Sequence, residues 1–167
     1  MQAYHNPNSY DEAKERLEIE RDRAFDDLVE ILEHTFNGHI ITGTEEEDFT
    51  NHFRDIFNEA YSLKRKLEAF RLEPTERTIK LIDDFGSIHR IVKQHNDGVI
   101  RKRLEKDREF FDHCLTYPLD EQQRRSIVSE EDNCLVVSSA GSGKTSSIVG
   151  KVKYLIEKKG IDPQIYY

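Results

Sequence analysis

Hydrophobic residues recur at helical spacing throughout residues 1–116, and charged residues separate them. Ser9 and Glu12 have the spacing of a capping box, which satisfies the free amides at the start of a helix. Asn37-Gly38 can end that helix, because glycine adopts the left-handed conformation of a helix C-cap. The stripe between these two ends consists of Leu17, Ala24, Leu28, Ile31 and Thr35. Phe25 and Leu32 lie beside it. The pattern predicts one helix between Ser9 and Asn37.

A longer apolar series follows a second capping box at Thr44 and Glu47. Its spacing alternates between four and three residues, which is the heptad seam of a coiled coil. The members of the seam are Phe49, Phe53, Ile56, Ala60, Leu63, Leu67 and Phe70. Such a seam needs a covering partner, and the loop of residues 37–44 is short enough for an antiparallel hairpin with the preceding helix.

Another helix is predicted to start at Pro74, since proline is favoured in the first helical turn. The apolar positions after it are Leu81, Phe85, Ile88 and Val92. Asn96-Asp97-Gly98 can end this helix. A further stripe contains Ile100, Leu104, Asp107 and Phe111. Residues 75–114 are therefore either one long helix interrupted near Gly98 or two helices.

The pattern changes after Tyr117. Asp120 can cap a short helix over residues 121–128. Residues 134–138 form a short apolar run, Cys-Leu-Val-Val-Ser, which is typical of a buried parallel strand. Residues 144–159 then predict a helix with Ile148, Val152 and Leu155 on one face, closed by Lys158, Lys159 and Gly160. Residues 165–167 have the character of a second strand.

A glycine-rich turn connects the predicted strand at 134–138 to the helix at 144–159, and this is the context that a P-loop requires. Gly141 and Gly143 let backbone amides converge on one anion, and the following helix adds its positive N-terminal end. Lys144 can reach the β- and γ-phosphates of ATP, and the Thr145 hydroxyl can hold Mg²⁺. The predicted cradle consists of Ser138, Ser139, Ala140, Gly141, Ser142, Gly143, Lys144 and Thr145. Ser138 stands where the general pattern has glycine.

Together these patterns predict a mostly α fold, in which an N-terminal helical hairpin or bundle precedes the start of a P-loop (RecA-like) α/β domain. We place the helical extension at residues 1–116 and the incomplete ATPase domain at residues 117–167. A glutamine upstream of the cradle fits this assignment, because its amide offers the donor and acceptor that pair with adenine N6 and N7.

The net charge of −8 lies in the helical extension. Residues 1–116 carry 26 acidic and 18 basic residues, whereas residues 117–167 carry seven of each. An acidic surface does not attract a phosphate backbone, so the extension is predicted to be a scaffold or a protein-contact element. The dense basic run is Arg101, Lys102, Arg103, Lys106 and Arg108. We interpret it as a solvated face paired to Glu105, Asp107 and Glu109; the alternative is a contact with nucleic acid or an acidic partner.

Two cysteines without CxxC spacing and a start without signal-peptide features predict a reduced, cytoplasmic setting. No apolar run approaches the length that spans a bilayer, so we expect no membrane partner.

The order Leu119-Asp120-Glu121-Gln122-Gln123-Arg124, Leu135-Val136-Val137 and Ala140-Gly141-Ser142-Gly143-Lys144-Thr145 resembles the opening of UvrD/Rep-type superfamily 1 helicases, especially relatives of DNA helicase IV. The resemblance covers about 45 of 167 residues. It implies that Gln123 reads adenine, with Gln122 as the alternative register, and that Arg124 belongs to the nucleotide site. It also implies that Lys144 and Thr145 serve ATP and Mg²⁺. The family often has Ala or Gly where this chain has Ser138 and Ser139.

The resemblance further implies a motor that couples ATP hydrolysis to translocation on single-stranded DNA. The family's acidic Mg²⁺-binding pair, transition-state arginine and DNA-binding motifs have no counterpart in these residues. We therefore expect an N-terminal piece of a longer helicase, with weak nucleotide binding at best and no unwinding by itself. The alternative is a protein-interaction module, in which the hairpin of residues 9–73 docks on another protein and the P-loop is vestigial. Another P-loop ATPase or a kinase is a third interpretation.

Overall fold

The computed structural model describes residues 7–130 and 143–163, and every regular element in these ranges is an α-helix. The mostly α prediction is therefore confirmed. The chain forms two compact units. The first unit comprises Met1–Asn37 and Glu45–Val92, and the second comprises Gly38–Thr44 and Lys93–Tyr167. None of the helices in the described ranges is long and apolar enough to span a bilayer.

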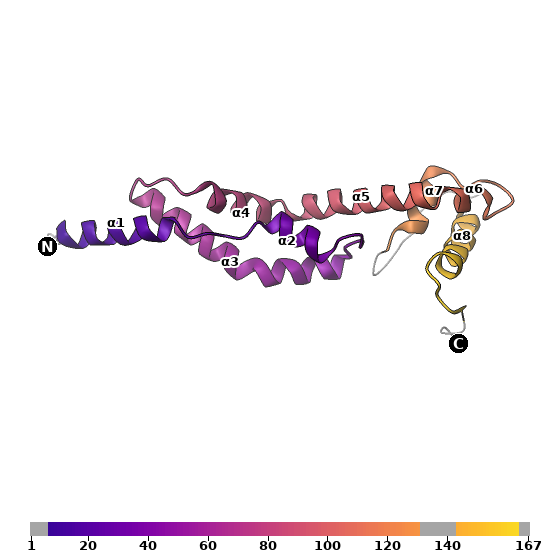
Figure 1. Ribbon diagram of the computed structural model, residues 1–167, viewed down its shortest axis with the longest axis horizontal. Helices are drawn as coiled ribbons and strands as arrows, with labels where there is room; N and C mark the ends of the chain where they lie inside the picture. The colour runs from indigo at the N-terminus through magenta and orange to yellow at the C-terminus, as the bar shows by residue number, and fades with distance from the viewer. Residues whose placement is uncertain (1–6, 131–142, 164–167) are drawn as a thin grey trace. The chain divides into compact units, whose positions relative to one another are not determined.

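The helices follow one another along the chain without any strand among the described residues. Their bounds are α1 Pro7–Arg21, α2 Leu28–Thr35, α3 Gly43–Ala69, α4 Glu76–Gly86, α5 Ile88–Lys106, α6 Arg108–His113, α7 Glu121–Val128 and α8 Lys144–Glu157 (Figure 1). Helix α5 begins in the first unit and continues into the second.

The single helix predicted between Ser9 and Asn37 is wrong, because the structure has two helices there. Helix α1 already includes Pro7, so Ser9 is not its cap. Asp27 starts α2 by accepting hydrogen bonds from the amides of Val29 (3.0 Å) and Glu30 (3.2 Å). An aspartate that binds nearby amides competes with helix continuation, which explains the interruption. The buried residues also differ from the predicted stripe: Leu17, Phe25, Leu28 and Leu32 are buried, whereas Ala24 and Thr35 are exposed.

The predicted antiparallel hairpin is present in the first unit. Contacts join residues 10–36 to residues 49–70: Tyr10 stacks on Phe70 with ring centroids 4.9 Å apart, Arg23 pairs with Glu59 at 2.7 Å, and Phe36 meets Phe49 edge-on at 5.9 Å. From one contact to the next, the residue number of the first partner rises from 10 to 36, while that of the second falls from 70 to 49. The two segments therefore run in opposite directions.

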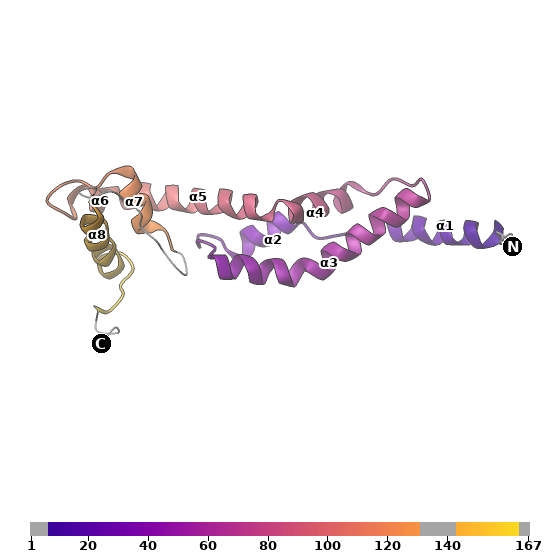
Figure 2. The same cartoon turned by 180° about the vertical axis from the view of Figure 1, so that it is seen from behind.

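The heptad seam of α3 faces the core, as its spacing predicts. Ala60, Leu63 and Leu67 are buried, as is Phe49. A neighbouring face of α3 carries Phe57, which stacks on Phe85 of α4 with ring centroids 4.4 Å apart. Helices α2, α3 and α4 lie alongside one another in both views (Figures 1 and 2). The first unit is thus a layered helical assembly around an apolar stripe.

Neither alternative for residues 75–114 is correct, because the structure has three helices with short breaks at Ser87 and Asp107. Pro74 precedes the first of them, and Thr75 is its N-cap. Helix α5 continues through Asn96-Asp97-Gly98, so the predicted end there is wrong. Tertiary contacts explain the continuation, since the Asn96 side chain binds the backbone of Ile41 and the residues after Gly98 are buried.

The core of the second unit draws on residues from widely separated parts of the chain. Its buried members are Ile40, Val99, Ile100, Phe110, Phe111, Cys114, Leu119, Ile127, Val128 and Tyr154. The unit therefore includes Gly38–Thr44, which connects α2 to α3, as well as residues 93–116. The compact units do not divide at residues 116 and 117, and the domain boundary proposed there stays a prediction.

Candidate nucleotide-binding site

Helix α7 begins as the sequence predicts, with Asp120 as its N-cap. The Asp120 carboxylate accepts a hydrogen bond from the backbone amide of Gln123 at 2.8 Å. The side-chain oxygen of Gln123 in turn accepts one from the backbone amide of Asp120 at 2.9 Å. This reciprocal capping box fixes the side chain of Gln123 at the start of the helix.

Helix α8 begins directly after Gly143, the last glycine of the predicted cradle. Gly143 has φ 82°, the left-handed conformation that glycine adopts at little cost. A glycine N-cap has no side chain to occupy the amides of the first turn, and that turn contains no acidic residue. Lys144 and Thr145 are both exposed at this end of the helix. The start of α8 therefore has the character of an anion-binding helix terminus.

Gln123 and Gly143 meet although 20 residues separate them. A Cβ atom added to Gly143 would collide with the side-chain amide nitrogen of Gln123. Gln122, the alternative register, is exposed. Of the two glutamines, the structure thus brings Gln123 to Gly143 at the start of α8.

Helices α7 and α8 pack closely along their lengths. A Cβ atom at Gly150 would lie 2.7 Å from Ile127 and 3.2 Å from Leu119. The Lys151 ammonium donates to the carbonyl oxygens of Ile127 (2.6 Å) and Ser129 (2.5 Å), which satisfies the end of α7. Glycine at position 150 permits this close approach.

The apolar face predicted for residues 144–159 is not the buried one. Ile148 and Val152 are 60% and 50% exposed, whereas Ser147, Gly150 and Tyr154 are buried. The small Ser147 and Gly150 admit α7, and the Tyr154 ring packs on Phe111 with centroids 5.6 Å apart. The helix ends near the predicted place, at Glu157, with Lys158 as C-cap and Gly160 at φ 67°.

Arg124 has structural partners in the second unit. Its Nε donates to the Leu119 carbonyl oxygen at 2.7 Å, and its guanidinium pairs with Asp112 at 2.8 Å. It also lies 5.9 Å from the centroid of the Phe111 ring. These contacts hold the segment before α7, and the nucleotide role of Arg124 stays a prediction.

Much of the predicted cradle lies outside the described residues, namely Ser138, Ser139, Ala140, Gly141 and Ser142, and so do the two predicted strands at 134–138 and 165–167. The roles predicted for Lys144 and Thr145 stay predictions as well.

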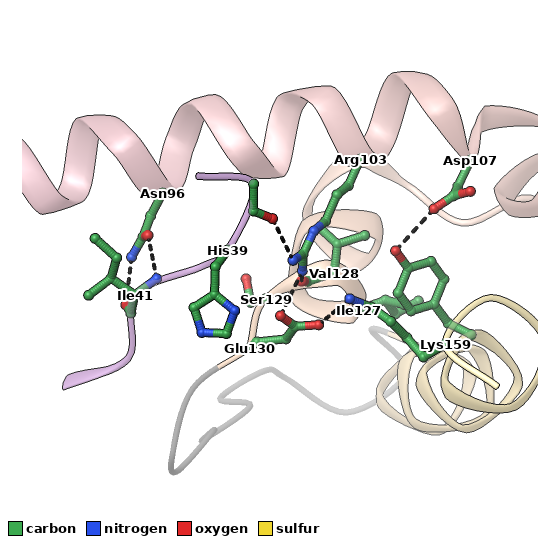
Figure 3. Close-up of polar contacts among 12 residues, drawn as sticks. His39, Ile41, Asn96, Arg103, Asp107, Ile127, Val128, Ser129, Glu130 and Lys159 are labelled. Atoms are coloured by element: carbon green, nitrogen blue, oxygen red, sulfur yellow. Dashed lines mark hydrogen bonds and ion pairs between the residues drawn. The ribbon is translucent and has the colours of Figure 1, made fainter. Parts of the chain in front are cut away.

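The basic run is not uniformly a solvated face. The Arg103 side chain is only 16% exposed, and it pairs with Glu130 at 2.8 Å rather than with the acids of its own helix. Its guanidinium also donates to the carbonyl oxygens of Val128 (3.5 Å) and Gly38 (3.3 Å). Glu130 makes a second ion pair with Lys159 at 2.6 Å. Figure 3 shows Glu130 between the two cations. No local spacing signals this cluster, because its members are 27 and 29 residues apart.

A comparison with family models matches the part of the chain that contains this candidate site. Residues 119–165 match the family model of the UvrD/REP helicase N-terminal domain. DNA helicase IV of Escherichia coli (strain K12) is 34% identical over 71 residues, which are 42% of this chain and 10% of that protein. A probable DNA helicase II homolog of Mycoplasma capricolum is 42% identical over 45 residues, which are 27% of this chain and 6% of that protein. The matched segments thus span a tenth or less of the length of these relatives. No solved structure matches the chain.

Proposed function

We propose that this chain, a segment of a UvrD-type DNA helicase, binds ATP and Mg²⁺. We further propose that the protein containing it couples ATP hydrolysis to translocation on, or unwinding of, DNA in the cytoplasm. The observation that carries the proposal is the placement of Gln123 against Gly143. An adenine-reading amide and a phosphate-binding turn have to lie together in such a site, and the packing of α7 on α8 brings the two residues together.

The described residues fit a bound nucleotide. The Gln123 carbonyl oxygen has two lone pairs, so it can accept from adenine N6 while it still accepts from the Asp120 amide. The exposed Lys144 and Thr145 stand at the helix terminus, where a phosphate chain and its magnesium ion would bind. Residues 138–142 would complete the cradle, and Arg124 would support the segment before α7. Bound ATP would supply the phosphoryl group whose transfer to water drives the motor.

Calorimetric titration of the whole chain with ATP and Mg²⁺ tests the proposal. Lys144→Ala is expected to weaken binding by about tenfold or more, since it removes a charged hydrogen bond to phosphate. Lys66→Ala is the matched control, because it removes the same charge from an exposed site on α3. The proposal fails if the unaltered chain does not bind ATP, or if both variants bind it equally well.

A hollow on the first unit favours docking of a protein as a second function. It measures about 350 Å³ and lies between α2 and the start of α3. Its lining contains no Lys or Arg and consists of Ile31, Thr35, Phe36, Glu45, Asp48, Phe49, His52 and Phe53. An apolar floor with acidic groups suits a basic peptide that carries one large apolar side chain. A helical peptide of Leu and Lys should bind the chain and lose affinity on Phe53→Ala; equal binding to the variant would exclude this hollow.

A further inference from the structure

Glu130 joins three elements of the second unit through two ion pairs. One carboxylate oxygen contacts Arg103 of α5, and the other contacts Lys159, two residues after α8 (Figure 3). Side-chain exposure is 16% for Arg103 and 30% for Glu130 and Lys159, so the pairs are partly shielded from solvent. Burial opposes ionisation of Glu130, but the hydrogen bonds from Lys159 and Arg103 outweigh it, and the pKa lies below its ordinary value. The carboxylate is therefore ionised, and both pairs hold at neutral pH.

The same cluster fixes the end of α7. Arg103 donates to the Val128 carbonyl oxygen at the last residue of that helix, and to Gly38 in the connection between α2 and α3. Lys151 binds the Ile127 and Ser129 carbonyl oxygens from the α8 side. The C-terminal end of α7 is thus held between α5 and α8 by charged groups.

Helices α7 and α8 run in the same direction, and this links the cluster to the nucleotide site. From start to end the facing pairs are Gln123 with Gly143, Ile127 with Gly150, Ser129 with Lys151, and Glu130 with Lys159. From Gln123 onward both partners advance together along the chain, while Leu119, which precedes α7, also reaches Gly150. Because close-packed interiors transmit strain, a change at the Glu130 end is expected to alter the placement of Gln123 at the other end of α7.

We propose that Glu130, held between Arg103 and Lys159, is a positioning residue for adenine recognition. It sets where α7 lies against α8, and so where the Gln123 amide stands relative to Gly143. The inference rests on the proposed ATP site and deepens it. It predicts that affinity for the base, rather than for the phosphates, depends on a carboxylate that does not contact the nucleotide.

The variant Glu130→Gln keeps the shape of the side chain and removes its charge. Calorimetry with the whole chain and Mg²⁺ should compare ATP, inosine triphosphate and inorganic triphosphate. We expect ATP affinity to fall by about three- to tenfold, as for one misplaced hydrogen bond, and the preference for ATP over inosine triphosphate to shrink. Affinity for inorganic triphosphate should stay unchanged. Glu130→Asp, which keeps the charge on a shorter side chain, should retain part of the preference.

Arg125→Gln is the matched control, because Arg125 pairs with Asp97 at 2.6 Å and also joins α7 to α5, but without α8. It should leave all three affinities unchanged. Amide NMR without nucleotide gives an independent measurement. The backbone signal of Gly143 and the side-chain signal of Gln123 should shift in Glu130→Gln and not in Arg125→Gln.

The outcomes separate the two proposals. If the unaltered chain binds ATP through Lys144, but Glu130→Gln weakens all three ligands equally or none of them, the positioning role is wrong and the ATP site stands. If the unaltered chain binds no ATP, the proposed function fails and adenine positioning fails with it. In that case a shift of the Gly143 and Gln123 signals would show only that the two ends of α7 are coupled.

Discussion

The two units of this chain are built in different ways from similar helices. The first unit carries 21 acidic and 12 basic residues, a net charge of −9, and the second carries 12 and 13, a net charge of +1. In the first unit, helices that follow one another cover a single apolar stripe on α3. In the second, residues far apart in the chain share one core, and charged side chains join them.

This difference shows what each kind of packing requires. A stripe is local, and any neighbouring helix with an apolar face can cover it. The second unit depends on particular long-range partners, such as Asn96 with Ile41 and Tyr154 with Asp107. The geometry of the candidate nucleotide site therefore depends on residues far from the motifs.

The largest effect on stability should come from truncating a buried side chain in the apolar stripe of α3. Leu67 is completely buried on α3, and Leu67→Ala should lower the free energy of unfolding by about 2–5 kcal/mol, because it leaves a cavity. Urea unfolding followed by circular dichroism measures this. Ile19→Ala on α1, where the side chain is 75% exposed, is the control and should stay within about 0.5 kcal/mol. Similar losses for the two variants would mean that α3 is not the centre of the first unit.

A glycine pair tests the second unit. Gly150→Val should cost about 1–3 kcal/mol, since its Cβ would press on Ile127 and Leu119 between α7 and α8. Gly98→Ala in α5 has open space around the new Cβ and should stabilise by up to about 1 kcal/mol through helix propensity. Thermal unfolding of both variants gives the comparison. Stabilisation by valine at position 150 would contradict the close packing of the two helices.

The sequence predicts those features that depend on local patterns. The stripe from Phe49 to Leu67, the hairpin and the Asp120 cap are present in the structure because periodicity and capping act over one or two helical turns. The apolar pattern does not predict the break before Leu28, because it continues across the place where Asp27 caps a new helix. The stop predicted at Asn96-Asp97-Gly98 was wrong because the Asn96 side chain serves a distant backbone instead of its own helix end.

The candidate site was predictable in its residue types and less so in its arrangement. Gly-Lys-Thr and the two glutamines stand out in the sequence, but only the packing of α7 on α8 favours Gln123 over Gln122. The basic run suggested a solvated face, yet Arg103 is directed to Glu130. Ion pairs between residues 27 positions apart leave no periodic signal in the sequence, so they can be identified only once the fold is known.

A loss of similar size should follow Asn96→Ala in the second unit. The Asn96 side chain accepts from the Ile41 amide and donates to the Ile41 carbonyl oxygen, both at 2.8 Å. Its removal leaves two groups of a buried residue without these bonds, which should cost about 1–3 kcal/mol. Hydrogen exchange at the Ile41 amide should accelerate, whereas Asn51→Ala on the exposed surface of α3 should leave it unchanged. Unaltered exchange in Asn96→Ala would mean that Gly38–Thr44 is held by its apolar side chains alone.

The smallest expected effect is on the titration of the Tyr154 hydroxyl. Burial, together with the hydrogen bond from the Tyr154 hydroxyl to Asp107 at 3.0 Å, raises the pKa of Tyr154 from 10.0 to about 12. Ultraviolet titration of the seven tyrosines should therefore show a late step, and Tyr154→Phe should remove it.

The sign of the stability effect follows from the raised pKa of Tyr154. Because the folded protein favours the neutral phenol, its contribution to the free energy of unfolding is fully present below pH 10.0 and is lost as the pH rises through about 12. Asp107→Asn removes the negative charge beside the hydroxyl, so it should lower the pKa of Tyr154 and bring the late step earlier, although burial still keeps it above 10.0. A titration in which Asp107→Asn leaves the late step in place would show that burial alone raises the pKa. The hydrogen bond between α8 and the break after α5 would then contribute less to the second unit than its geometry indicates.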